Sequence, residues 1–117
     1  MGREEVMILR ERALMFLAAA RDDLRAGREA AFHAEQACQL ALRYVLVLGA
    51  GYYPHTHSLR RLFEEVRAVK PELWSLYERH KFAFEVMEDA YLGARDLPRR
   101  YSRDVVEVAE ELVALCT

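Results

Sequence analysis

The stretch from Ala30 to Val47, AAFHAEQACQLALRYVLV, constrains the fold more than any other part of the sequence. Small or apolar residues recur along it at the i, i+3, i+4, i+7 spacing that places a wide apolar face on one side of a helix. They are Ala30, Ala34, Ala37, Cys38, Ala41, Leu42, Val45 and Leu46. Because alanines remove bulk from this face, neighbouring helices can approach it closely. The pattern predicts the central helix of a bundle.

A polar stripe lies beside this apolar face. It is formed by Glu35, Gln39 and Arg43 at i, i+4 and i+8, with Gln36 at its edge. Side chains four residues apart on a helix surface can form weak ion pairs and hydrogen bonds. We expect this stripe to be a solvated flank of the central helix.

Four further segments have helical spacing and end signals. Gly27 ends the first helix, and Ser58 is the expected N-cap of a short third helix. Pro71 opens a long fourth helix, and Pro98 ends it. Ser102 is the expected N-cap of the last helix. The expected ranges are residues 4–26, 59–69, 71–95 and 103–116, with the central helix over residues 28–48. They predict an all-α protein, an antiparallel up-and-down bundle of four long helices and one short helix.

Length and charge exclude several classes of protein. A chain of 117 residues supports one domain, 1–117, and its two cysteines, Cys38 and Cys116, are expected to be buried thiols. With a net charge of −2, any site for a polyanion must be local. There is no signal-peptide core and no run of ~18 apolar residues, so we expect a cytoplasmic protein that does not enter a membrane.

The sequence has few motifs of known chemistry. It lacks a phosphate-binding glycine loop, an HExxH helix, a CxxC pair and a nucleophile elbow. His55 and His57 in PHTHS are a weak metal signal without neighbouring Cys or carboxylate ligands, so we expect no metal and no cofactor. The role favoured for them is hydrogen bonding that fixes the loop before Ser58.

Arg28 and His33 form an R-x4-H pair, the spacing used by some metal-free ribonucleases. In such enzymes arginine holds the phosphate and histidine transfers a proton. Residues five apart point to different sides of a helix, and 15 of the 17 basic residues are arginines, so a chance match explains the pair more simply. Catalysis by Arg28 and His33 is the alternative.

An aromatic ring and four guanidiniums surround the expected end of the fourth helix. They belong to Tyr91, Arg95, Arg99, Arg100 and Arg103. Such a group can stack a base and bind a phosphate. The alternative is a solvated basic turn whose arginines pair with helix carbonyls or with Glu107.

Three stretches, FHAEQACQLALRYVLVLG, HTHSLRRLFEEV and YLGARDLP, occur in the order that resembles the HEPN (higher eukaryote and prokaryote nucleotide-binding) domain family. Its members have a small-residue helix with an AxQAxExALK-like core, a tHdL helix start and a Y-x-x-x-R-Y-P element. The resemblance covers residues 10–115. The family positions correspond to Gln36, Ala37, His57, Ser58, Leu59, Tyr91, Arg95 and Pro98.

The resemblance implies an antiparallel bundle, usually dimeric, often made beside a minimal nucleotidyltransferase as its toxin-like or substrate-presenting partner. The R-x4–6-H motif of the nuclease branches belongs near the fourth-helix end, but no histidine follows His80, and ARDLPRRY replaces the ARYP pattern. We therefore expect a non-catalytic or toxin-like partner of a nucleotidyltransferase, with nucleotide or RNA phosphate bound between Tyr91 and Arg103. Tyr91, Arg95 or Ser102 could receive a nucleotide.

Two other functions stay open. The first is a metal-independent endoribonuclease toxin that uses Arg28 and His33, or Arg95 and His57 from two subunits. The second is a structural dimer without a ligand. A homodimer is expected in any case, because apolar residues extend beyond the core stripes of the first and fourth helices. They are Met7, Ile8, Leu14, Met15, Trp74, Phe82 and Val86.

Overall fold

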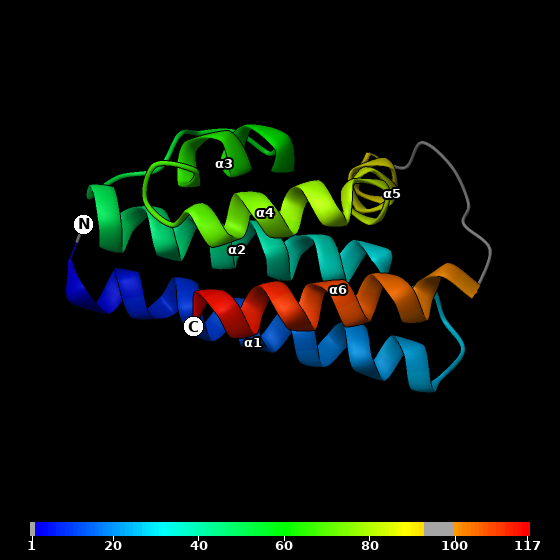
Figure 1. The fold of residues 1–117 in the computed structure, drawn as a ribbon. Helices are drawn as coiled ribbons and strands as arrows, with labels where there is room; N and C mark the ends of the chain where they lie inside the picture. The colour runs from blue at the N-terminus through cyan, green and yellow to red at the C-terminus, as the bar shows by residue number, and fades with distance from the viewer. Residues whose placement is uncertain (1, 93–99) are drawn as a thin grey trace.

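The computed structural model describes residues 2–92 and 100–117. Within these ranges the chain is all-α, as predicted, and forms an up-and-down bundle (Figure 1). The helices are α1 (Arg3–Arg25), α2 (Ala31–Ala50), α3 (Leu59–Val66), α4 (Pro71–Arg79), α5 (Lys81–Tyr91) and α6 (Arg100–Cys116). No helix in the described part of the chain combines the length and the apolar character needed to cross a membrane.

Helix α2 is the centre of the bundle, as its alanine-lined face predicts. It contacts α1, α3, α5 and α6 (Figure 1). Ala34, Ala37 and Ala41 are fully buried, and Ala20 of α1 and Ala109 of α6 are buried against the same core. Small side chains at these positions let the helices pack closely.

The fourth helix is broken, which corrects the prediction of one helix over residues 71–95. His80 has non-helical backbone angles, φ −125° and ψ 30°, and serves as the C-cap of α4 and the N-cap of α5. Helix α5 therefore turns away from α4 and is seen end-on in Figure 1. This turn brings Phe84 and Met87 into the core. No glycine or proline marks the break.

Several helix ends also differ from the predictions. Helix α2 starts at Ala31 and not at Arg28, because the amide of Arg28 still bonds to the carbonyl of Asp23 at 2.8 Å beside the left-handed Gly27. At its other end α2 runs through Gly49 to a left-handed cap at Gly51. Gly49 lies so close to Val69 that a Cβ atom would come within 2.2 Å of Val69 Cγ1.

Of the two predicted serine caps, one is confirmed. Ser58 caps α3, and its Oγ accepts a hydrogen bond from the amide of Arg61 at 3.3 Å. The other is wrong, because α6 already begins at Arg100 and Ser102 is buried inside it. Pro71 opens α4 as expected.

The expectation that Glu35, Gln39 and Arg43 form a solvated flank is wrong. Glu35 and Gln39 are only 0% and 2% exposed, and Arg43 is half-buried. The segment between α2 and α3 covers them, because Gln39 and Arg43 both donate hydrogen bonds to its backbone. A polar network therefore lies inside the protein.

Candidate functional site

A row of aromatic rings crosses the surface between the start of α2 and the end of α5. Phe32 lies parallel to Tyr91, with an interplanar angle of 7° and ring centroids 6.3 Å apart. Tyr91 in turn stacks on His57, with centroids 5.4 Å apart. Phe32 also makes a T-shaped contact with His33, with ring centroids 5.7 Å apart. We call His57, Tyr91, Phe32 and His33 the aromatic row.

A cavity of about 170 Å³ adjoins one end of this row. It is lined by His57, Ser58, Glu88, Tyr91 and Leu92. Its volume is below the ~300–1,000 Å³ of usual small-molecule sites. It is therefore suited to hold one part of a ligand, with the rest of the ligand along the surface.

Glu88 fixes the wall of this cavity by joining α5 to the start of α3. Its Oε1 accepts hydrogen bonds from the amide of Leu59 at 2.5 Å, from the amide of Arg60 at 3.2 Å and from Ser58 Oγ at 3.3 Å. A carboxylate at a helix N-terminus is stabilised by the free amides and the helix dipole. The cavity thus has a negatively charged side that disfavours phosphate.

The buried network of α2 holds the segment that carries His57. Gln39 Nε2 donates to Glu35 Oε2 at 2.5 Å and to the carbonyl of His57 at 3.3 Å. Arg43 Nη2 donates to Gln39 Oε1 at 2.8 Å and to the carbonyl of Thr56 at 3.0 Å. The position of His57 beside Tyr91 therefore depends on side chains from the core of the bundle.

Burial raises the pKa of Glu35 to about 7. The hydrogen bonds donated by Gln39 and Gln36 and the positive charge of Arg43 oppose this rise, whereas the negative charge of Glu88 adds to it. Burial dominates because a carboxylate loses its hydration when it leaves water. Glu35 can consequently exchange a proton near neutral pH.

Arg28 and His33 come together at the other end of the row. Arg28 Nε donates to Asp23 Oδ1 at 3.1 Å, and His33 Nδ1 lies 2.5 Å from Asp23 Oδ2. The expectation that they point to different sides of one helix is wrong, because Arg28 precedes α2 and the buried Asp23 of α1 lies between them. Asp23 engages Nδ1 of His33, which leaves Nε2 for a ligand or a proton.

The predicted arginine patch falls largely outside the described residues. Arg95, Pro98 and Arg99 lie in 93–99, and the side chain of Arg100 is not described either. Arg103 is exposed on α6, and Tyr91 belongs to the aromatic row. The union of these residues in one phosphate site stays a prediction. The burial of Ser102 removes it as an accessible nucleotide acceptor.

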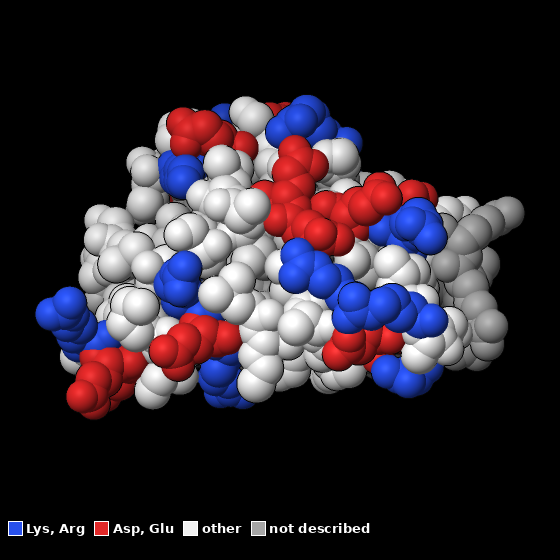
Figure 2. Space-filling model, turned by 90° about the horizontal axis from the view of Figure 1, so that it is seen from below, with Lys and Arg blue, Asp and Glu red and all other residues white. Residues whose placement is uncertain are grey.

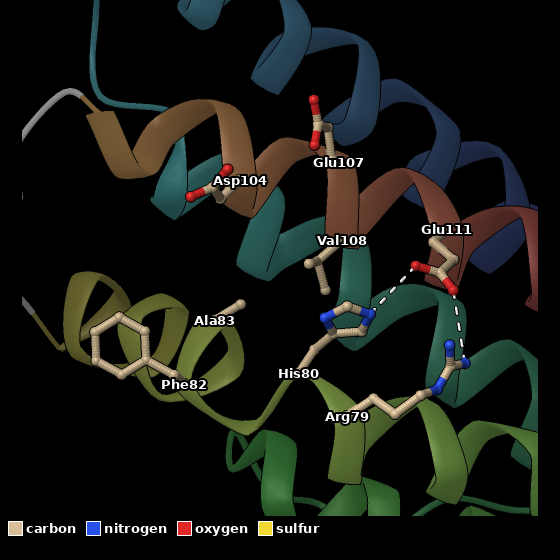
Figure 3. A pocket seen from close by; sticks show the side chains of 8 residues that line it. All are labelled: Arg79, His80, Phe82, Ala83, Asp104, Glu107, Val108 and Glu111. Atoms are coloured by element: carbon tan, nitrogen blue, oxygen red, sulfur yellow. Dashed lines mark ion pairs between the residues drawn. The ribbon is translucent and has the colours of Figure 1, made fainter.

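A second cavity, of about 390 Å³, lies between the α4–α5 junction and α6 (Figure 3). Glu111 Oε2 lies 3.4 Å from His80 Nε2, and Glu111 Oε1 lies 3.6 Å from Arg79 Nη2. Asp104 and Glu107 line the same wall, so the cavity is unsuited to a phosphate. Among the described residues, no group of three or more His, Cys, Asp or Glu side chains is placed to hold a metal ion.

Charges elsewhere are mixed. Figure 2 shows basic and acidic side chains interspersed over the face that it presents, with acidic residues gathered near its upper middle. This agrees with the small net charge of the chain. On this face, a site for an anionic ligand must therefore be formed by a few individual residues.

Three residues of this region were missed by sequence reasoning: Asp23, Phe32 and Glu88. Phe32 carries a signal, since it is a large apolar residue outside the alanine-lined face, and it is 46% exposed. Asp23 and Glu88 carry none, because Asp23 meets its partners only across the turn between α1 and α2, and Glu88 meets its partners at the start of α3.

The chain matches a known protein family. The family model described as HEPN domain matches residues 6–116, nearly the whole chain. No curated protein and no solved structure matches the chain.

Proposed function

The chain belongs to the HEPN domain family, and on that premise we propose that it is a nucleotide- or RNA-binding bundle that acts as the non-catalytic or toxin-like partner of a minimal nucleotidyltransferase. Membership of the family supports a nucleotide- or RNA-related function. The observation that carries the proposal is the aromatic row beside its cavity.

The row suits a nucleobase. Exposed aromatic rings stack on bases of any sequence, and each stacked base contributes ~1–3 kcal/mol. Phe32 is 46% exposed, whereas Tyr91 is half-buried with Phe32 and His57 stacked beside it, so Phe32 offers the larger free surface to a ligand. We place the base against the exposed surface of Phe32 and Tyr91, next to the cavity that His57 lines.

The charges at the two ends of the aromatic row indicate how a nucleotide would be oriented. Glu88 disfavours phosphate at the cavity end, whereas Arg28 lies at the opposite end and is mostly exposed. Its Nε is bound to Asp23, and its two Nη groups remain for a phosphate. In the proposed complex the phosphate lies toward Arg28 and His33. The predicted contribution of Arg95, Arg99, Arg100 and Arg103 stays part of the proposal.

The proposal includes a homodimer. Met7, Ile8, Leu14 and Met15 of α1 are exposed, and we call them the α1 stripe. On the fourth-helix side the expectation needs correction, because Val86 is buried in the core and Trp74 is partly buried under Arg67. Phe82 alone of that group is strongly exposed. We therefore propose the α1 stripe as the dimer surface.

Two measurements test the function. Calorimetry with AMP and with a short single-stranded RNA measures nucleotide binding, and a pull-down with the tagged chain from the cells that naturally make it, analysed for a nucleotidyltransferase, tests the partnership. We expect binding in the first and a stable complex in the second. Failure of both rejects the proposal.

A second candidate function is a metal-independent endoribonuclease. It is favoured by the convergence of Arg28 and His33 on Asp23, which gives an oriented imidazole beside a guanidinium. RNA incubated with purified protein and a chelator would be cleaved, and His33→Ala would abolish the cleavage. No cleavage, or cleavage that survives both His33→Ala and His57→Ala, removes this candidate. His57→Ala is included because it tests the alternative pair formed by Arg95 and His57 from two subunits.

A further inference from the structure

Two side chains of α2 hold the backbone of residues 54–58, the segment before α3, by hydrogen bonds. Gln39 donates to the carbonyl of His57 and Arg43 donates to the carbonyl of Thr56. The Arg43 guanidinium also lies 5.5 Å from the ring centre of Tyr53 in the same segment. These contacts, together with the Thr56 Oγ1 bond to the amide of Ser58, determine where His57 stands relative to Tyr91.

Glu35 controls both of these side chains. It accepts from Gln39 and Gln36, and its negative charge attracts Arg43, whose own bond goes to Gln39. Hydrogen bonds to a charged acceptor are about twice as strong as neutral ones. A neutral Glu35 binds the Gln39 amide more weakly and leaves the half-buried Arg43 without this charge partner.

We infer that Gln39 and Arg43 are positioning residues for the His57 side of the cavity, and that proton uptake by Glu35 from solvent loosens their hold on residues 54–58. With Glu35 ionised, the segment is fixed and His57 stacks on Tyr91. With Glu35 neutral, Arg43 turns toward solvent and the segment is released. The aromatic row is therefore complete only in the ionised state.

The surroundings of Glu35 place this change near neutral pH. Burial is the main cause of its pKa of about 7. The other charged groups that act on it among the described residues are Arg43 on α2, which favours the ionised form, and Glu88 on α5, which opposes it. The buried Cys38 thiol on α2 also faces this charge, and its own pKa is raised mainly by burial. Residues 54–58 also carry two imidazole side chains, those of His55 and His57.

This inference concerns the cavity of the proposed function, and its meaning for binding rests on that function. The coupling itself is measured without a nucleotide, so the two can fail separately. The experiment is an NMR titration of the full chain from pH 5 to pH 9. It follows the side-chain carboxyl carbon of Glu35 and the backbone amides of Thr56 and Ser58.

We expect the carboxyl signal and both amides to share a step near pH 7. Because the imidazoles of His55 and His57 flank the amides that are followed, the step assigned to Glu35 is the part that disappears in Glu35→Gln. Gln39→Met removes the link between Glu35 and the segment. In this variant Glu35 still titrates, but the amides of Thr56 and Ser58 no longer follow it. Glu64→Gln, an exposed carboxylate of α3, is the control and leaves the step unchanged.

Two results would overturn the inference. One is a Glu35 carboxyl that is already fully ionised at pH 5.5. The other is an amide step of the same size and midpoint in Gln39→Met as in the unmodified protein. If Glu35→Gln does not fold, Gln39→Met and the shared midpoint in the unmodified protein decide the question.

Discussion

Asp23 Oδ2 lies 2.5 Å from His33 Nδ1, and this contact joins the end of α1 to the start of α2. The same buried carboxylate accepts from Arg28 through its other oxygen. Three side chains from the α1–α2 turn are thus held in one arrangement. Loss of the carboxylate removes both contacts together.

We predict that Asp23→Ala lowers the free energy of unfolding by about 1–3 kcal/mol, because it leaves two donors without their buried acceptor. The control is Asp22→Ala. Asp22 pairs with Arg25 on the exposed surface, and such pairs contribute at most ~1 kcal/mol. Urea denaturation of both variants measures the difference. Equal stability of the two variants would contradict a structural role for Asp23.

Removal of a ring from the aromatic row should weaken nucleotide binding. We predict that Tyr91→Ala and Phe32→Ala each raise the Kd for AMP or short RNA by about tenfold, from the ~1–3 kcal/mol of one base–aromatic stack. Tyr52→Ala is the control, because Tyr52 is an exposed tyrosine in the loop after α2 that is not a member of the aromatic row. Calorimetry gives the three constants. An unchanged Kd in both row variants would move the ligand to another surface.

The stability of the protein should depend on pH through Glu35. Its pKa is about 7 in the folded state against 4.5 for an exposed glutamate. Between these values the unfolded chain is ionised while the folded chain keeps its proton, so unfolding releases a proton and stability falls as pH rises. The favourable contribution is complete below pH 4.5 and is lost as pH rises through about 7.

The size of this loss follows from the shift. At about 1.4 kcal/mol for each pKa unit, roughly 2–3 kcal/mol disappears between pH 5 and pH 8. Urea denaturation should show this fall in the unmodified protein, in excess of that in Glu35→Gln. The same measurement on Glu64→Gln should retain it. A Glu35→Gln variant with the full pH dependence would show that another group is responsible.

The bundle could be predicted from the sequence because the residues that define each helix lie close together in the chain. The alanines of α2 repeat at helical spacing, and the inward face of α3, formed by Leu59, Leu62, Phe63 and Val66, follows the same rule. The break at His80 could not be predicted, since no helix-breaking residue marks it. The break precedes a helix, α5, whose Phe84 and Met87 are buried in the core.

The candidate site depends instead on contacts between distant segments. Glu35, Gln39 and Arg43 have the spacing of a surface stripe, and only the fold of residues 52–58 over α2 makes them a buried network. Phe32 and Tyr91 are far apart in the chain and meet because α5 turns. Arg28 and His33 have a recognisable spacing, but their meeting depends on Asp23.

Gly49 should be intolerant of a side chain. Gly49→Ala would place a Cβ 2.2 Å from Val69 Cγ1, and overpacking of this kind costs about 1–3 kcal/mol. This cost exceeds the ~0.5–1 kcal/mol that alanine gains over glycine in a helix. The double variant Gly49→Ala/Val69→Ala should recover part of the loss in thermal denaturation. A single variant as stable as the unmodified protein would mean that α2 and Val69 can move apart freely.

The α1 stripe should hold two copies of the chain together. Met7, Ile8, Leu14 and Met15 are each more than a third exposed, which concentrates apolar surface on one helix. We predict a dimer at micromolar concentration in light scattering, and a monomer with unchanged helical circular dichroism for Ile8→Glu/Met15→Glu. Leu48→Glu/Phe32→Glu, which adds the same two charges at exposed residues of α2, should remain a dimer. A monomeric unmodified protein would contradict the dimer, and a dimer that persists in the double variant would assign the interface to another face.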